Sequence, residues 1–213
     1  WGKNMGNWIL TGLIVGVVVI IILAKFYQRS SKDVAFVRTG LGGEKVVLTG
    51  GKLSIPIVHQ ITPVNMNTLR LDVKRIESNA LVTKDRMRVD LHVVFYVRVI
   101  GDKAGVALAA QTLGSRTLNQ ESIQNLLEGK FVDSMRSITA EMTLDELHEQ
   151  GKIFVTKISA IIQESIAYNG LELESVSLNT MDQSAKEFFN SDNTFDAEGL
   201  VKITRDIEKS RKT

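Results

Sequence analysis

Side chains suited to catalysis or metal binding are few in this sequence and widely spaced. Cysteine is absent, which removes thiolate nucleophiles, disulfides and cysteine-based zinc sites together. His59 lies in a predicted strand, His92 on the polar face of another strand, and His148 near a helix start. Metal and general-base sites need convergent groups, often with a local signature such as H-E-x-x-H, and the sequence contains no such signature. We therefore expect no catalytic residue, no metal site and no cofactor.

Phosphate and nucleic-acid chemistry are also disfavoured. Leu41-Gly42-Gly43 is glycine-rich, but a predicted strand follows it, so no helix N-terminus is available to hold a phosphate. We interpret this stretch as a turn. Lys and Arg number 26 against 24 Asp and Glu, and this formal net charge of +2 is not that of a general nucleic-acid-binding protein. No nucleic acid partner is expected.

The chain is instead organised by an apolar segment, residues 4–24, that carries no charged side chain. At about 1.5 Å per residue, about 20 helical residues cross a hydrocarbon core of about 30 Å. A helix is the one single-segment structure that satisfies its own backbone in lipid. We predict a membrane-spanning helix here. Its predicted membrane-spanning side chains are Trp8, Ile9, Leu10, Leu13, Ile14, Val17, Val18, Ile21, Ile22 and Leu23.

The flanks of this segment bear on its interpretation. A secretory signal peptide would usually have a shorter apolar region with positive charge in front, whereas here most of the charge follows, from Lys25 to Arg38. A buried helix of a large soluble protein is the other alternative. The same charge asymmetry places the C-terminal side in the cytoplasm. The sequence starts with Trp1 rather than methionine, which indicates a segment of a longer protein.

Gly12 and Gly16 form a G-x-x-x-G step on one face of the predicted helix. Such a step lets two helices approach closely, which would make these residues packing points. The ordinary tolerance of membrane helices for glycine is the alternative explanation.

A second membrane contact is suggested by an apolar, proline-containing stretch close behind the predicted span. Leu53, Ile55, Pro56 and Ile57 would enter the inner leaflet as a shallow anchor, as exposed apolar patches near membranes do. The alternative is an ordinary core strand with Pro56 at its edge.

From Asp33 to about Val99 the hydrophobic period is two, which predicts strands. Residues 46–48 and 52–55 flank Thr49-Gly50-Gly51, which predicts a hairpin. The clearest strand runs from residue 86 to 99, with one apolar and one polar face. Its apolar face comprises Met87, Val89, Leu91, Val93, Phe95, Val97 and Val99. A small, mostly antiparallel β domain is expected.

From Gly101 onward the period becomes helical. Residues 104–113 predict a short helix, and Asn119 is suited to cap a longer one that runs to about Ala140. The apolar stripe of that longer helix comprises Ile123, Leu126, Leu127, Phe131, Met135 and Ile138.

Local signals are strong at both ends of the next helix. Thr143 and Glu146 form a capping-box pattern at its start, and Asn169-Gly170 is a good left-handed stop. Its apolar stripe comprises Phe154, Ile158, Ile161, Ile162 and Ile166. A strand over residues 171–178 follows, and the shift of its apolar phase between Leu173 and Val176 predicts a β-bulge.

The last residues, 196–213, are charged and helical in pattern. Leu200, Ile203 and Ile207 are spaced three and then four apart, the spacing of a coiled-coil seam. We predict that they form a seam between subunits of an oligomer.

Several segments together resemble the SPFH (band 7) domain, the family of prohibitins, stomatins and flotillins. Resemblance to its first half is carried by residues 35–43 (AFVRTGLGG), 64–69 (VNMNTL) and 83–90 (TKDRMRVD), with the Pro56-Ile57 step. Resemblance to its second half is carried by residues 130–133 (KFVD), 142–143 (MT) and 169–178 (NGLELESVSL), and residues 193–200 (NTFDAEGL) resemble the entry to a coiled coil. The pattern is most similar to bacterial flotillins.

The resemblance implies an α+β fold in four parts. Residues 1–32 would hold the N-terminal segment and transmembrane helix, and residues 33–100 a β-rich SPFH1-like domain. Residues 101–192 would form an SPFH2-like α/β domain, and residues 193–213 the start of a coiled coil.

The resemblance also implies a membrane scaffold and not an enzyme. Such a protein would be a single-pass protein of the bacterial inner membrane, with most of the chain cytoplasmic. Its partners would be the lipid bilayer, further copies in a large ring or cage that organises a membrane microdomain, and an NfeD-type membrane protein. The alternative is a stoichiometric regulator or sequestering partner of a membrane protease or other membrane protein.

Overall fold

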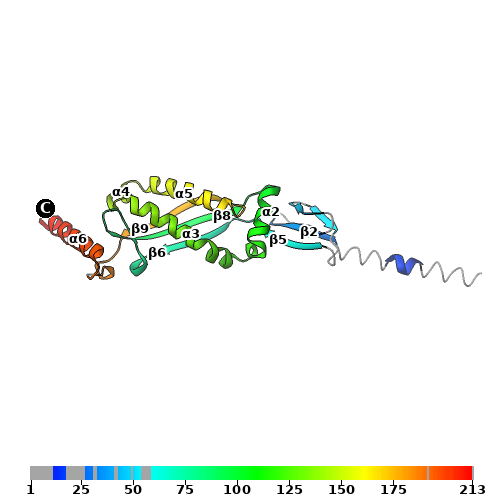
Figure 1. Cartoon of the computed structure of the whole chain (residues 1–213), viewed down its shortest axis with the longest axis horizontal. Helices are drawn as coiled ribbons and strands as arrows, with labels where there is room; N and C mark the ends of the chain where they lie inside the picture. The colour runs from blue at the N-terminus through cyan, green and yellow to red at the C-terminus, as the bar shows by residue number, and fades with distance from the viewer. Residues whose placement is uncertain are drawn as a thin grey trace, which may run out of the picture.

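The computed structural model of the chain describes residues 12–17, 27–30, 33–40, 43–48, 50–53, 59–190 and 192–212. The described body is elongated, with strands β2 and β5 near one end and helix α6 at the other (Figure 1). A four-stranded sheet and a layer of helices lie between these ends.

The N-terminal strands form two small antiparallel sheets. Their bounds are β1 Tyr27–Ser30, β2 Val34–Gly40, β3 Lys45–Val47, β4 Gly50–Leu53 and β5 His59–Asn65. Strand β2 pairs with both β3 and β5, whereas β4 pairs with β1. The hairpin predicted around residues 49–51 is therefore wrong. The segments on its two sides are strands, but each pairs with an earlier strand of the chain.

The main sheet is built around one long strand, β8. It comprises β6 Leu69–Arg75, β7 Leu81–Val82, β8 Arg88–Val99 and β9 Leu171–Gln183, with the short 3-10 helix η1, Glu77–Asn79, between β6 and β7. Strand β8 pairs antiparallel with β6 and β7 along one edge and with β9 along the other. The predicted apolar face of β8 is confirmed, because every residue on it from Met87 to Val99 is buried.

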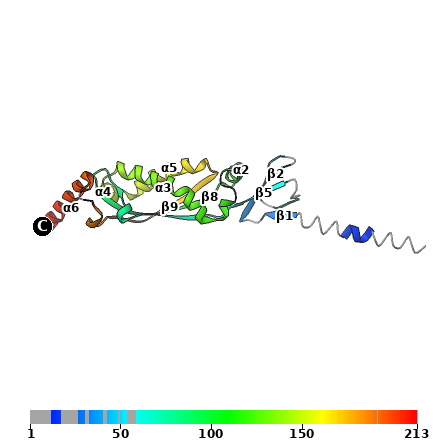
Figure 2. The same cartoon turned by 60° about the horizontal axis from the view of Figure 1, so that its bottom comes forward.

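Helices cover one face of this sheet, as Figures 1 and 2 show. They are α2 Lys103–Thr112, the 3-10 turn η2 Gly114–Leu118, α3 Gln120–Glu141, α4 Leu144–Glu149 and α5 Gly151–Ala167. The apolar stripes of α3 and α5 pack on β8 and join a single core, in which Phe95 stacks on Phe131 at 4.6 Å between ring centroids. Leu126 and Ile161 are exceptions, because each lies at the solvent edge of its stripe and stays exposed.

The predicted local signals around these helices are confirmed, but the single helix predicted between Thr143 and Gly170 is two helices, α4 and α5, which are separated at Gln150. Asn119 accepts from the Ser122 amide as N-cap of α3, and Thr143 and Glu146 form both hydrogen bonds of a capping box. Gly170 ends the helix before β9 with a φ of +72°. An added Cβ at this position would lie 2.4 Å from the Gly105 carbonyl oxygen. The turn therefore needs glycine both for its positive φ and for the lack of space.

Strand β9 carries the predicted bulge and continues further than predicted. The register against β8 shifts between Leu173 and Ser175, which leaves Glu174 as the extra residue, and shifts again between Leu178 and Thr180. The strand ends at Gln183, after which the 3-10 helix η3, Lys186–Phe188, leads to α6, Thr194–Lys212.

The predicted domain boundary at residue 100 falls between the end of β8 and Asp102, the N-cap of α2. Strand β9, from the predicted second domain, pairs with β8 from the first, and residues of both join one hydrophobic core. The division into two domains stays a prediction.

The predicted membrane span is described only at residues 12–17, which are helical. Leu13, Ile14 and Val17 are exposed there, and the other predicted spanning residues lie outside the described residues. Within the described ranges, no helix has both the length and the apolar character needed to cross a bilayer.

Candidate functional site

The feature that sets the course of the C-terminal helix is its junction with the turn between β7 and β8. We call this the α6 junction and define it by Asp85, Arg86 and Arg88 on the body and Asp196 and Lys202 on α6. The helix starts after Asn193, whose side chain accepts a hydrogen bond from the Phe195 amide. On its inner face, Ile203 is 3% exposed and packs into the core of the body.

Asp196 makes the most buried contact of the α6 junction. The residue is 2% exposed, and its carboxylate accepts from Arg88 Nε and Nη2, each at 2.9 Å, in a two-bond pairing. The Asn190 amide donates to the same carboxylate at 3.0 Å. Because Arg88 is the first residue of β8, this pair joins the first turn of α6 to the central strand of the main sheet.

Asp85 joins three elements through one carboxylate. It accepts from Thr83 Oγ1 at 2.6 Å within its own turn and from the Leu144 amide at 3.1 Å at the start of α4. Lys202 of α6 donates to its second oxygen. The neighbouring Lys84 amide also donates to the Met142 carbonyl at 2.9 Å, so the turn is held from two sides.

Arg86 occupies a strained backbone conformation at the same turn, with a φ of +62°. Its guanidinium pairs with Glu198 and lies over the Phe195 ring at 4.9 Å from the centroid. Its carbonyl faces Gly199, where an added Cβ would approach it to 2.6 Å. Glycine at this position therefore allows α6 to lie directly against the turn.

Electrostatics favour the charged forms of these groups. The hydrogen bonds from Arg88 hold the pKa of Asp196 below its usual value, despite burial. Burial alone would raise the pKa of Asp85, but the hydrogen bonds from Lys202, Thr83 and the Leu144 amide together keep it lowered. The hydrogen bond to Asp85 raises the pKa of Lys202 in turn.

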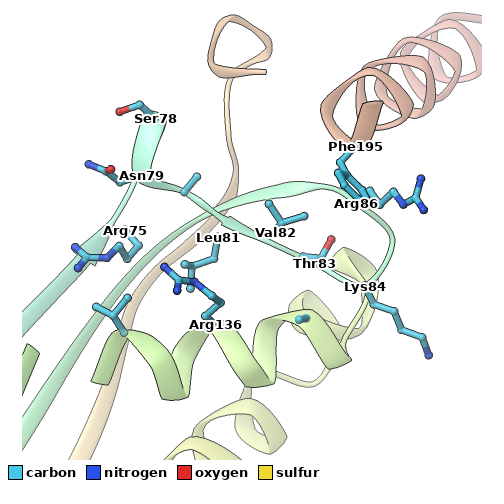
Figure 3. Close-up of a pocket in the computed structure, with 13 residues that line it drawn as sticks. Arg75, Ser78, Asn79, Leu81, Val82, Thr83, Lys84, Arg86, Arg136 and Phe195 are labelled. Atoms are coloured by element: carbon cyan, nitrogen blue, oxygen red, sulfur yellow. The ribbon is translucent and has the colours of Figure 1, made fainter. Parts of the chain in front are cut away.

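Beside the α6 junction lies a groove of about 880 Å³ between η1, β7, the C-terminal half of α3 and the start of α6. Figure 3 shows Arg86 next to Phe195 at one end, and Arg75 and Arg136 turned to the same side further along β7. We call it the basic groove. The described residues that line it include Arg75, Lys84, Arg86 and Arg136 and no acidic residue.

The structure gives the residues of the predicted coiled-coil seam different surroundings within one chain. Ile203 is buried against the body, Leu200 is partly buried beside it, and Ile207 is 38% exposed. The outer face of α6 instead presents Val201, which is 59% exposed. As a contact between subunits, the seam stays a prediction.

The predicted membrane contacts also stay predictions. Gly12 and Gly16 lie in the helical residues 12–17, where nothing approaches an added Cβ within 4 Å. Leu53 is the last residue of β4. Ile55, Pro56 and Ile57 lie outside the described residues.

The histidines lie on three different elements. His59 starts β5, His148 lies in α4, and His92 of β8 lies 3.0 Å from Asp72, measured from Nε2 to Oδ1. The contact with His92 is the main cause of a lowered pKa of Asp72. Among the described residues, no three His, Cys, Asp or Glu side chains are grouped so that they could hold a metal ion.

Comparison with known proteins gives the family. The SPFH domain / Band 7 family matches residues 19–207, and the chain belongs to this family. It is 49% identical over 213 residues to the flotillin family inner membrane protein YqiK of Escherichia coli, covering 99% of this chain and 38% of that protein.

Two further relatives are more distant. The chain is 29% identical over 197 residues to the flotillin family inner membrane protein sll1021 of Synechocystis, covering 91% of this chain and 29% of that protein. It is 25% identical over 187 residues to the flotillin-like protein FloT of Bacillus subtilis, covering 78% of this chain and 35% of that protein. The chain thus spans little more than a third, or less, of the length of these relatives.

These findings confirm the family and the α+β fold class that were predicted from the sequence. Two relatives are named inner membrane proteins, which supports a membrane location for this chain. The expectation that the chain is not an enzyme agrees with its membership of the family.

The α6 junction was missed by sequence reasoning. Its ion pairs join residues 108 and 117 positions apart, and no local period marks such pairs. The one local signal at this turn is the run of three charged residues at 84–86, a pattern that is equally typical of a solvated face.

Replacing Asp196 by asparagine tests the α6 junction directly. The substitution removes the charge that Arg88 pairs with in a buried position, so we expect a loss of about 3 kcal/mol in the docking free energy of α6. Hydrogen exchange of the α6 amides would show this as faster exchange. Asp192→Asn is the matched control, because Asp192 is exposed just before the helix. Equal exchange in both variants would contradict the assigned role of Asp196.

The pH dependence of α6 docking follows from the pKa shifts. Asp85 and Asp196 have pKa values below the ordinary 3.8, so their contribution is present above that value and is lost as pH falls through the lowered pKa. The raised pKa of Lys202 means that its contribution is present below the ordinary 10.5 and is lost as pH rises through the raised value. We expect docking to be constant between about pH 5 and pH 9 and to weaken below about pH 4. The rate of protease cleavage at residues 189–196, followed as a function of pH, measures the docking of α6. A transition near neutral pH would contradict this prediction.

Proposed function

We propose that this chain is the membrane-proximal part of a flotillin-like scaffold, in which many copies assemble into a large ring or cage. The observation that carries the proposal is the combination of family membership with a C-terminal helix held to the body by paired charges. A ring closes only if each copy repeats the same rotation relative to its neighbour. A helix fixed to its domain gives every copy the same shape.

The N-terminal segment would serve as the anchor. Residues 4–24 are uncharged and long enough to cross a bilayer as a helix, and relatives of this chain are named inner membrane proteins. We propose a single membrane span with the body in the cytoplasm, which follows from the positive charge between Lys25 and Arg38. Anchoring holds all copies at one height and in one orientation, so that weak lateral contacts act at high effective concentration.

The surface of the described body suits contacts between copies. Phe195 and Val201 are more than half exposed on α6, and Leu126 and Ile161 are exposed on the helix layer. Exposed apolar side chains that form a contiguous patch with a polar rim are typical of surfaces that bind other proteins. Within the proposal, these faces contribute to the lateral contacts, and an assembled ring would organise a membrane microdomain with an NfeD-type membrane protein as a further partner.

A stoichiometric regulator or sequestering partner of a membrane protease is the second candidate function. It needs the same anchor and the same exposed surfaces, but it predicts a fixed ratio to another protein. The size and composition of particles extracted from membranes distinguish the two candidates.

Imaging of the chain extracted with its native lipids tests the proposed assembly. We expect closed or arc-shaped particles many times the 23.6 kDa mass of one chain, with the chain itself as the main component. Mass spectrometry of the same particles identifies other proteins. A uniform monomer or dimer would refute the scaffold, and a fixed-ratio protease partner would favour the regulator.

A further inference from the structure

The two edges of the main sheet differ in what covers them. Along β6, each main-chain carbonyl that points away from β8 accepts a hydrogen bond from a side chain. Gln120 of α3 donates to the Arg70 carbonyl at 2.6 Å. Gln124 donates to the Asp72 carbonyl at 3.0 Å, and the Lys74 carbonyl accepts from a neighbouring arginine at 2.9 Å. Side chains in these positions block the approach of a further strand, so the β6 edge is closed.

The opposite edge of the sheet is formed by β9, which pairs only with β8. Opposed residues of an antiparallel pair either face each other with their main chains or face away together. The Ser184 amide donates to the Arg88 carbonyl, so every second residue of β8 from Arg88 onward faces β9. Val176 and Leu178 lie opposite the residues between these positions, so their amides and carbonyls point outward.

This outward edge of β9 is open over its central part. The Leu173 amide, which belongs to the same outward set, donates to Gln163 Oε1 of α5 at 2.7 Å, and this side chain covers that one position. Among the described residues, no group bonds to the outward amides or carbonyls of Val176 and Leu178. Two donors and two acceptors are therefore available to an added strand.

The side chains of β9 indicate which kind of strand would fit. On the side of the helices, Val176 and Leu178 are half-buried and pack against the core. Of the three acidic residues of β9, Glu174 and Asp182 form no ion pair with a described residue, and the strand contains no Lys or Arg. An added strand thus continues an apolar face on one side and lies beside carboxylates. Alternating apolar and basic side chains complement both features.

The main sheet of a second copy does not supply this strand. A two-fold pairing of β9 with β9 of another copy is antiparallel. The strands run along the long axis of the body (Figures 1 and 2), so such copies would point in opposite directions, and their proposed anchors could not enter one membrane. Pairing of β9 with β6 of another copy is blocked by the side chains that cover the β6 edge.

We propose that the β9 edge at Val176 and Leu178 binds an extended segment of another protein, with alternating apolar and basic side chains, by antiparallel strand addition. The register shifts at Glu174 and Asn179 limit the pairing to the stretch between them. The apolar side chains of the segment continue the face under the helices, and its basic side chains lie near Glu174 and Asp182. This binding site goes beyond the proposed scaffold, because a single chain already contains it.

Binding of a synthetic strand to the full chain tests the charge preference. The probe is the fluorescein-labelled peptide Lys-Val-Lys-Val-Lys-Val-Lys, and its binding is followed by fluorescence anisotropy. The matched peptide Glu-Val-Glu-Val-Glu-Val-Glu keeps the apolar side chains and reverses the charge. We expect saturable binding of the first peptide and binding of the second that is weaker by about tenfold or more. Equal binding of the two peptides, or no binding of the first, would overturn the proposal.

Methylation of the peptide backbone separates strand addition from charge attraction. In antiparallel addition the valines lie opposite Val176 and Leu178, so the valine amides point toward β9 and the lysine amides point away. N-methylation of the valines removes the donors to β9 and should weaken binding by about tenfold or more. N-methylation of the lysines is the matched control and should leave binding unchanged. If methylated valines bind as the unmodified peptide does, no strand is added.

Hydrogen exchange of the chain locates the bound peptide. The amides of Val176 and Leu178 should exchange about tenfold more slowly when about nine-tenths of the chain is occupied, whereas the β6 edge should be unaffected. Unchanged exchange in β9, or equal slowing at both edges, would show that the site is wrong although the scaffold stands. If the chain binds the peptide but does not assemble, the proposed scaffold fails and the strand-addition site stands.

Discussion

The course of α6 depends on two carboxylates that are removed from bulk water and paired with cations. Asp196 is almost fully buried, and an isolated charge there would be costly. Arg88 offsets that cost only when its guanidinium meets both carboxylate oxygens, which restricts the helix to one position. Asp85 adds a second tie two turns further along the helix, through Lys202. Two points of attachment on one helix fix its direction as well as its place.

These ion pairs can fix α6 because their partners on the body are themselves held in rigid elements. Arg88 starts the central strand β8, whose apolar face is packed under α3 and α5. The turn that carries Asp85 and Arg86 is bonded to the start of α4 by Lys84 and Leu144 amides. Hydrophobic burial thus positions the strand, the strand positions the turn, and the turn positions the helix. The close approach at Gly199 is the last step in this sequence.

Elements whose signals are local could be predicted from the sequence. The caps at Asn119 and Thr143, the glycine stop at Gly170 and the bulge at Glu174 depend on residues only a few positions apart. The predicted hairpin at residues 49–51 failed because strand pairing is decided by distant partners, which local alternation does not identify. The α6 junction could not be predicted for the same reason. Its charged residues are far apart in the sequence, and there they look like any other exposed charged residues. The helical spacing of Leu200, Ile203 and Ile207 was recognised, but spacing alone does not say whether a helix faces its own domain or another chain.

The chain is a rigid unit whose helix α6 leaves the body in one direction, fixed by the pairs Arg88–Asp196 and Asp85–Lys202. The chain contains no cysteine, so spin labels can be placed at Ser137→Cys on α3 and Ser210→Cys on α6 without background labelling. Pulsed electron resonance on this doubly labelled chain, diluted in excess unlabelled chain at neutral pH, measures the distance between the labels within one copy. A single narrow distance distribution is the predicted result, and a broad distribution would contradict the claim that the paired carboxylates fix the helix.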